Sequence, residues 1–69
     1  MERLKELRER RKLSQIFLGM ELSISQNAIS QYETGSREAD YATLIAIADY
    51  FDVSIDYLLG RTDNPKVNR

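Results

Sequence analysis

The fold is decided by one stretch of sequence, QIFLGMELSISQNAISQYETG, which runs from Gln15 to Gly35. It predicts two short helices joined by a tight turn. Ser25 can cap the second helix by accepting hydrogen bonds from the N–H groups of the first turn. Gly35 follows the last residues of that helix, in the position where glycine commonly ends one.

The second of these helices carries two kinds of side chain on opposite faces. Ile29 and Tyr32 lie on one face, and polar side chains follow one another on consecutive turns of the other. The polar residues are Gln26, Asn27, Ser30 and Gln31. Because Gln and Asn hold a donor and an acceptor side by side, each can pair with adenine in a bidentate fashion. The pattern suits a helix that lies in a major groove; the alternative is a solvated helix face.

The stretch resembles the helix-turn-helix of the Cro/C1-type (XRE) family of bacterial and phage repressors. The family pattern is a Gln that opens the first helix, a small residue four positions later, an apolar residue that closes that helix, a Ser or Thr cap, and then Ile-Ser-x-Tyr-Glu-x-Gly. The matching residues are Gln15, Gly19, Leu22, Ser25, Ile29, Ser30, Tyr32, Glu33 and Gly35. The closing DYLLGRT of residues 56–62 is also common in such domains, so the resemblance covers about residues 1–62.

Two positions depart from the family pattern. Gly19 stands where alanine is usual, and Ser23 stands in the turn where glycine is usual. Glycine inside a helix costs roughly 0.5–1 kcal/mol relative to alanine, so we expect Gly19 to allow a close approach between helices. Ser23 must adopt whatever backbone conformation the turn demands.

The resemblance implies a DNA-binding site made of two sets of residues. Base edges would be met by Gln26, Asn27, Ser30 and Gln31. Phosphates would be met by Ser14, Gln15 and Arg37. Ser14 and Gln15 begin a helix, and the free N–H groups of a helix start attract phosphate. The family uses this Gln position for phosphate, although simple capping is the alternative, and it places the loop that holds Arg37 along the DNA backbone.

The resemblance also implies that Arg8 contacts Glu33, because the family often pairs these positions across the domain. Such a pair would be structural, and the alternative is two independent surface charges. Nearby, Arg10, Arg11 and Lys12 would either add phosphate contacts or form a solvated helix end that the helix dipole favours.

Three apolar residues form a feature that the family does not usually show: Ile16, Phe17 and Met20. They lie at i,i+3 and i,i+4 spacing on the outer side of the helix whose core side holds Leu18 and Leu22. One interpretation is partial burial against the preceding helix or the tail. The other is a contact surface for a protein partner, since exposed apolar clusters tend to mark interaction sites.

The whole chain is predicted to form a compact all-α domain of five helices, of the λ-repressor-like kind, with the helix-turn-helix at the second and third. The helices are expected over residues 2–11, 15–22, 26–34, 41–51 and 55–59, with caps at Ser14, Ser25, Asp40 and Ser54. The domain spans residues 1–62, and residues 63–69 form a frayed tail. The predicted core consists of Leu4, Leu7, Leu18, Leu22, Ile29, Tyr32, Leu44, Ile47, Ala48, Phe51, Leu58 and Leu59.

Composition narrows the functions that such a domain can have. With 69 residues and no Cys or His, the chain has no disulfide, thiolate chemistry, zinc finger or histidine acid–base catalysis. It also lacks a glycine-rich phosphate loop, so we expect neither an enzyme nor a cofactor or metal site. The N-terminus is charged from Glu2 onward, which argues against a signal peptide. The longest apolar run, residues 44–48, is too short to span a bilayer, so we expect a cytoplasmic protein.

Charge is unevenly distributed along the chain, although the net charge is only −1. Residues 1–37 hold seven basic and five acidic side chains, whereas residues 38–60 hold five acidic ones and no base. Residues 61–69 hold three basic side chains and one acidic one. The half with the helix-turn-helix is thus mildly basic and would face DNA, while attraction to phosphate stays modest.

The leading expectation is a sequence-specific DNA-binding transcriptional regulator, a repressor that acts as a homodimer on an inverted repeat. Dimeric proteins of this kind place two recognition helices roughly 34–36 Å apart. Self-association is expected around the fifth helix and the residues just after it. The alternative is a protein-interaction module, such as an antitoxin or anti-repressor component, with Ile16, Phe17 and Met20 as its contact.

Overall fold

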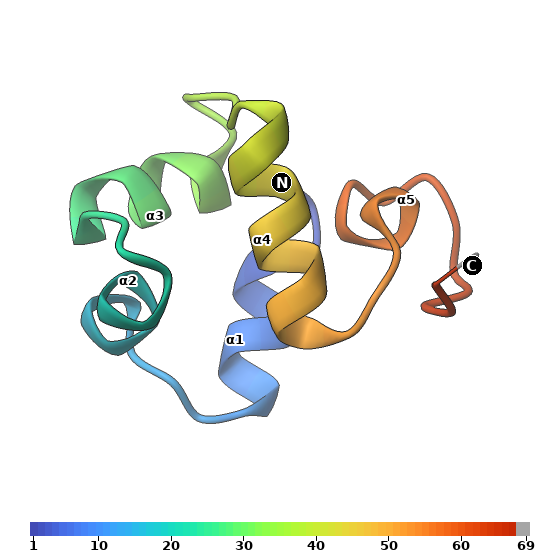
Figure 1. The fold of residues 1–69 in the computed structure, drawn as a ribbon, viewed down its shortest axis with the longest axis horizontal. Helices are drawn as coiled ribbons and strands as arrows, with labels where there is room; N and C mark the ends of the chain where they lie inside the picture. Colours follow the sequence, from blue (N-terminus) through green and yellow to red (C-terminus); the bar gives the residue numbers. More distant parts are fainter. Residues whose placement is uncertain (68–69) are drawn as a thin grey trace.

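The computed structural model describes residues 1–67 and shows five helices and no strand within them (Figure 1). The helices are α1 (Leu4–Arg10), α2 (Gln15–Leu22), α3 (Gln26–Thr34), α4 (Tyr41–Phe51) and α5 (Ile55–Leu58). The predicted all-α, five-helix architecture is confirmed. In this part of the chain, no helix has the length and apolar character needed to cross a bilayer.

Four of these helices begin at a side-chain cap. An oxygen of each capping side chain accepts a hydrogen bond of 2.8–3.1 Å from the backbone N–H three residues further on. The capping residues are Ser14, Ser25, Asp40 and Ser54, as predicted. Each cap satisfies an N–H that the first turn leaves without an intrahelical partner. α1 has no such cap, and it begins two residues later than the sequence predicted, at Leu4.

All five helices contribute to one core. In Figure 1, α4 runs through the middle of the molecule, between the α2–α3 pair on one side and α5 on the other. The buried apolar residues are Leu4, Leu7, Leu18, Ala28, Ile29, Tyr32, Ile47, Ala48, Phe51, Val53, Tyr57 and Leu58. Ile29 and Tyr32 therefore anchor one face of α3 in the core, while the opposite face of α3 stays open.

The predicted core was wrong at its edges. Leu22, Leu44 and Leu59 are only partly buried, although Leu22 and Leu44 still pack against the core. Leu22 and Leu59 stand at the ends of short helices, where fewer neighbours surround a side chain. The buried residues that the sequence did not predict are Ala28, Val53 and Tyr57. Val53 lies between α4 and α5, so no helical periodicity points to it.

The segment after α5 is held against the domain. The sequence predicted a frayed tail from residue 63 onward. In the structure the Asp63 carboxylate accepts a hydrogen bond from Arg3 at 2.7 Å. The carbonyl oxygen of Pro65 accepts one from the backbone N–H of Ser54 at 3.0 Å. Residues 68–69 of the expected tail lie outside the described residues.

Candidate nucleic-acid interface

The turn between α2 and α3 brings the two helices into close contact. Ser23 adopts a left-handed conformation, with φ 56° and ψ 41°, and so ends α2. The backbone N–H of Ile24 then donates to the carbonyl oxygen of Gly19 at 2.8 Å. A Cβ at position 19 would lie only 2.4 Å from the carbonyl oxygen of Ile24. Gly19 therefore permits a close approach, but what approaches it most closely is the backbone of the turn and not, as predicted, a neighbouring helix.

α3 separates an apolar back from a polar front, as the sequence predicted. Ala28, Ile29 and Tyr32 are buried in the core. On the front, Gln26 and Asn27 are exposed in the first turn, and Ser30 and Gln31 are partly exposed one turn further on. The polar side chains therefore stand on the open face of a helix that is anchored from behind.

The predicted pair of Arg8 and Glu33 is confirmed, and it is almost buried. Arg8 Nε donates to Glu33 Oε2 at 2.6 Å, and Arg8 Nη2 donates to Glu33 Oε1 at 3.1 Å. A third donor, Arg8 Nη1, reaches the carbonyl oxygen of Leu13 at 2.7 Å. The two side chains are 11% and 3% exposed. This bidentate pair ties α1 to the end of α3 and is structural rather than available to bases.

Burial and hydrogen bonding act on the Glu33 carboxyl in opposite directions. Burial raises its pKa, but hydrogen bonds from Arg8 and Gln15 outweigh burial and leave the pKa of Glu33 below its usual value. The hydrogen bond to Glu33 in turn raises the pKa of Arg8. Glu33 is therefore ionised at neutral pH, and its charge is balanced inside the domain.

A chain of hydrogen bonds continues from Glu33 to the open face of α3. Gln15 Nε2 donates to Glu33 Oε1 at 3.0 Å, and Gln26 Nε2 donates to Gln15 Oε1 at 3.4 Å. The sequence did not predict the contact between Gln15 and Gln26. The sequence feature that could have indicated this contact is a repeated Ser-Gln pair, because each glutamine is the first residue after a serine cap. The contact holds Gln26 in place at the start of α3.

Three of the basic residues that the sequence offered as phosphate contacts are placed in different ways. Arg37 is exposed in the loop after α3, with its guanidinium 5.6 Å from the centre of the Tyr32 ring. Arg11 instead donates to the carbonyl oxygen of Tyr50 at 3.2 Å, near the end of α4. Arg10 lies 3.8 Å from the carboxylate of Glu6. Of these three, Arg37 is the one that lies beside α3.

The three apolar residues on the outer side of α2 are exposed, not buried against α1 or the tail. The exposed fractions are 56% for Ile16, 45% for Phe17 and 75% for Met20. Phe17 also supplies the backbone N–H that Ser14 caps, so this surface begins at the start of α2. We refer to Ile16, Phe17 and Met20 as the α2 patch.

Comparison with known proteins shows the class to which this fold and interface belong. Residues 4–58 match the helix-turn-helix family. The chain belongs to the Cro/C1-type (XRE) helix-turn-helix proteins, and its five helices form the λ-repressor-like fold of that family. No solved structure matches the chain.

Several similar proteins come from Bacillus subtilis (strain 168). The chain is 48% identical over 66 residues to the HTH-type transcriptional regulator YqaE, covering 96% of this chain and 57% of YqaE. It is 37% identical over 67 residues to the HTH-type transcriptional regulator ImmR, covering 97% and 53%. It is 36% identical over 61 residues to the HTH-type transcriptional regulator AnsR, covering 88% and 53%. The chain thus spans about half the length of these relatives.

Proposed function

We propose that this chain binds double-stranded DNA in a sequence-specific manner and regulates transcription as a repressor. One observation carries the proposal: α3 presents Gln26 and Asn27 on its open face while Ile29 and Tyr32 anchor it in the core. A recognition helix held in this way can enter a major groove without moving relative to its domain. The similarity to transcriptional regulators supports the same function.

In this proposal the front of α3 reads base edges. The base-reading residues are Gln26, Asn27, Ser30 and Gln31. The contact with Gln15 uses one N–H of the Gln26 amide, which leaves its carbonyl oxygen and its second N–H for a base. Because Gln15 already restrains Gln26, less side-chain entropy is lost when DNA binds. These features support bidentate recognition of adenine.

Phosphates are contacted on either side of α3, by Ser14, Gln15 and Arg37. α2 starts at Gln15, and N–H groups at a helix start favour a phosphate. The Gln15 amide has a second N–H besides the one that it donates to Glu33. Arg37 is exposed, and a guanidinium can bind a phosphate with two parallel hydrogen bonds.

The DNA-bound form is a homodimer on an inverted repeat. Two copies would place their α3 helices roughly 34–36 Å apart, in successive major grooves on one side of the duplex. Exposed apolar side chains on α4 and α5, Ile45 and Ile55, support an interface in the C-terminal half. Sedimentation of the protein alone and with DNA tests this: two chains per site are expected, and a monomer in both states would exclude the dimer.

A second candidate function rests on the exposure of the α2 patch. An apolar cluster of this kind supports a contact with a protein partner, as in an antitoxin or anti-repressor component. The patch begins at Ile16, directly after Ser14 and Gln15, which are both proposed phosphate contacts. A protein that covers the patch would therefore compete with DNA for the start of α2.

Selection of bound sequences from a random DNA pool separates the two candidates. DNA reading predicts one enriched half-site, repeated in inverted orientation, and an affinity that falls linearly with salt on logarithmic axes. A pool without enrichment, or binding that does not respond to salt, would refute sequence-specific recognition and leave the protein contact as the better explanation.

A further inference from the structure

Glu33 is a buried carboxylate at the inner end of a row of hydrogen bonds that leads to the open face of α3. Its side chain is only 3% exposed. Gln26 donates to Gln15 at 3.4 Å, and Gln15 donates to Glu33 at 3.0 Å. We call these three side chains the amide row. Glu33 thus lies two side chains behind a proposed base reader and can act on it without touching DNA.

The carboxylate sets the direction of every bond in the amide row. An ionised carboxylate only accepts hydrogen bonds, so the Gln15 amide has to turn its NH2 group toward Glu33. The carbonyl oxygen of Gln15 then faces away from Glu33 and accepts from Gln26 Nε2. Two amides alone could bond in either direction, because each holds a donor and an acceptor. The carboxylate removes this freedom.

Arg8 holds the carboxylate in place. Its Nε and Nη2 donate to the two oxygens of Glu33, at 2.6 and 3.1 Å. Arg8 is itself fixed by its bond of 2.7 Å to the carbonyl oxygen of Leu13. Glu33 Oε1 therefore stays turned toward Gln15 before any DNA is bound.

The direction of the amide row decides which purine Gln26 complements. Adenine offers a donor at N6 beside an acceptor at N7, whereas guanine offers two acceptors, O6 and N7. With Nε2 bonded to Gln15, Gln26 has its carbonyl oxygen and one N–H left for a base, which suits adenine. Turned over, the same amide would bond to Gln15 through its oxygen and have two N–H groups left, which suit guanine.

We propose that Glu33 is a positioning residue that selects adenine over guanine at the base pair contacted by Gln26, because it fixes the direction of the Gln15 and Gln26 amides. The inference rests on the proposed function, in which α3 reads base edges. It gives the buried pair of Arg8 and Glu33 a part in sequence preference besides its tie between α1 and α3.

Glu33→Gln tests the inference, because it lets the inner end of the amide row donate. Arg8 has donors only, so the carbonyl oxygen of the new amide should keep the 2.6 Å contact with Arg8 Nε. The new NH2 group then replaces Oε1, the atom that faces Gln15. Gln15 and Gln26 should both turn over, and the ratio of affinities for adenine and guanine sites should fall roughly tenfold.

This ratio is measured by titrating duplexes that differ only at the base pair where Gln26→Ala relaxes the preference. A loss of folded protein weakens binding to both duplexes by the same factor, so a purely structural role of Glu33 would leave the ratio unchanged. A further duplex carries hypoxanthine opposite cytosine. It keeps O6 and N7 but lacks the minor-groove amino group of guanine, so it should behave as guanine does.

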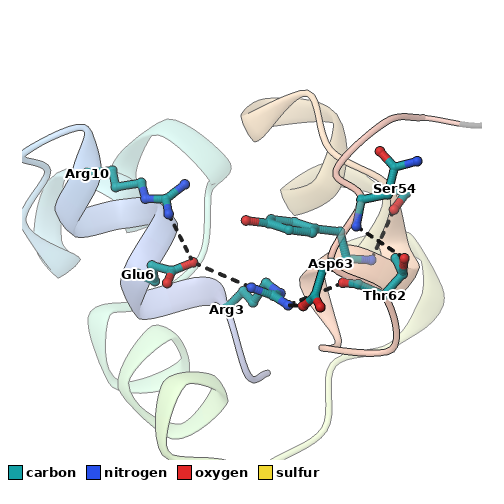
Figure 2. Close-up of polar contacts among 8 residues, drawn as sticks. Arg3, Glu6, Arg10, Ser54, Thr62 and Asp63 are labelled. Atoms are coloured by element: carbon teal, nitrogen blue, oxygen red, sulfur yellow. Dashed lines mark hydrogen bonds and ion pairs between the residues drawn. The ribbon is translucent and has the colours of Figure 1, made fainter.

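Asp63→Asn is the matched control, since it also removes one negative charge and also takes a carboxylate from an arginine. The contacts of Arg3 with Asp63, Thr62 and Glu6 join the start of the chain to the segment after α5 and not to α3 (Figure 2). The ratio should therefore stay as it is in the unmodified protein.

Gln15→Ala tests whether the effect passes through the amide row. It keeps the pair of Arg8 and Glu33, so it can be titrated even if Glu33→Gln is too unstable. Because Gln26 can then turn freely, the ratio should fall, and adding Glu33→Gln should change it no further. An unchanged ratio in Gln15→Ala, or a further change in the double variant, would show that Glu33 does not act through Gln15.

The remaining outcomes separate this inference from the proposed function. If the unmodified protein enriches no sequence from the random pool, the proposed function fails and the inference fails with it. If it enriches a site, the inference alone is wrong in three cases: the base pair read by Gln26 does not favour adenine, Glu33→Gln keeps the full ratio, or Asp63→Asn lowers it as much.

Discussion

At the scale of single residues, the stability of the domain depends on how one buried charge is compensated. Glu33 is nearly inaccessible to solvent and receives hydrogen bonds from Arg8 and Gln15. Replacing Arg8 by Ala would leave the carboxylate buried without its cation, which should cost about 3–5 kcal/mol. The free energy of unfolding in urea measures this loss.

Arg10→Ala is the control for that measurement. Arg10 also belongs to α1 and also pairs with a carboxylate, that of Glu6 at 3.8 Å, but both side chains are well exposed. The substitution should cost at most about 1 kcal/mol. Similar losses in the two variants would show that the Arg8 pair is no more important than an ordinary surface pair.

The proposed base readers and phosphate contacts should respond differently to substitution. Gln26→Ala should weaken binding to the selected site by about 1–3 kcal/mol and relax the preference at one or two base pairs. Arg37→Ala should weaken binding to every sequence and reduce the salt slope by about one. Titration of both variants on matched and scrambled sites, at several salt concentrations, measures these effects. A uniform loss with unchanged sequence preference in both variants would contradict the assignment.

At the scale of the elements, the turn between α2 and α3 carries a backbone cost that a single substitution can remove. Ser23 has a left-handed backbone, which L-residues adopt at a cost of about 1–2 kcal/mol. Ser23→Gly removes that cost but adds entropy to the unfolded chain, worth about 0.4–1 kcal/mol. The net gain should be roughly 0.5–1 kcal/mol, which corresponds to a rise of a few degrees in melting temperature.

Ser36→Gly is the control for the turn, because Ser36 does not have a positive φ. It has no backbone strain to relieve, and it loses the hydrogen bond between the Ser36 and Thr34 hydroxyls. We expect a lower melting temperature. A rise in both glycine variants would show that the effect does not depend on the left-handed backbone of Ser23.

Whether a contact could be predicted from the sequence depends on how far apart its residues lie along the chain. The caps of α2, α3, α4 and α5 depend on residues three positions apart, and they were predicted correctly. The pair of Arg8 and Glu33 came from the family resemblance. The bond between Gln15 and Gln26 was missed because it joins two side chains from different helices. The contact of Arg3 with Asp63 spans 60 positions, and no local pattern points to it.

At the scale of the whole molecule, the free energy of unfolding should fall at acidic pH but should hardly change with pH near neutrality. The chain has no histidine, so no side chain with an ordinary pKa between about 5 and 8 is present. Protonation of two carboxyls is expected to cause the loss of stability at acidic pH. Hydrogen bonds from Thr43 hold the pKa of Asp40 below its usual value, and those from Arg8 and Gln15 do the same for Glu33 against the effect of burial.

The direction of the acid response follows from these lowered pKa values. The folded protein binds the Glu33 proton more weakly than the unfolded chain, so the stabilisation is complete above the unfolded pKa of about 4.3 and is lost as the pH falls through the lower, folded value. Urea unfolding should give constant stability from about pH 7 to pH 5.5 and a steep decline below pH 4. Glu33→Gln should be less stable at pH 7 but should decline less steeply, by about one proton, because this site no longer titrates. A decline that already begins between pH 7 and pH 5.5, or a Glu33→Gln variant with the full acid slope, would show that other groups control the acid unfolding of this domain.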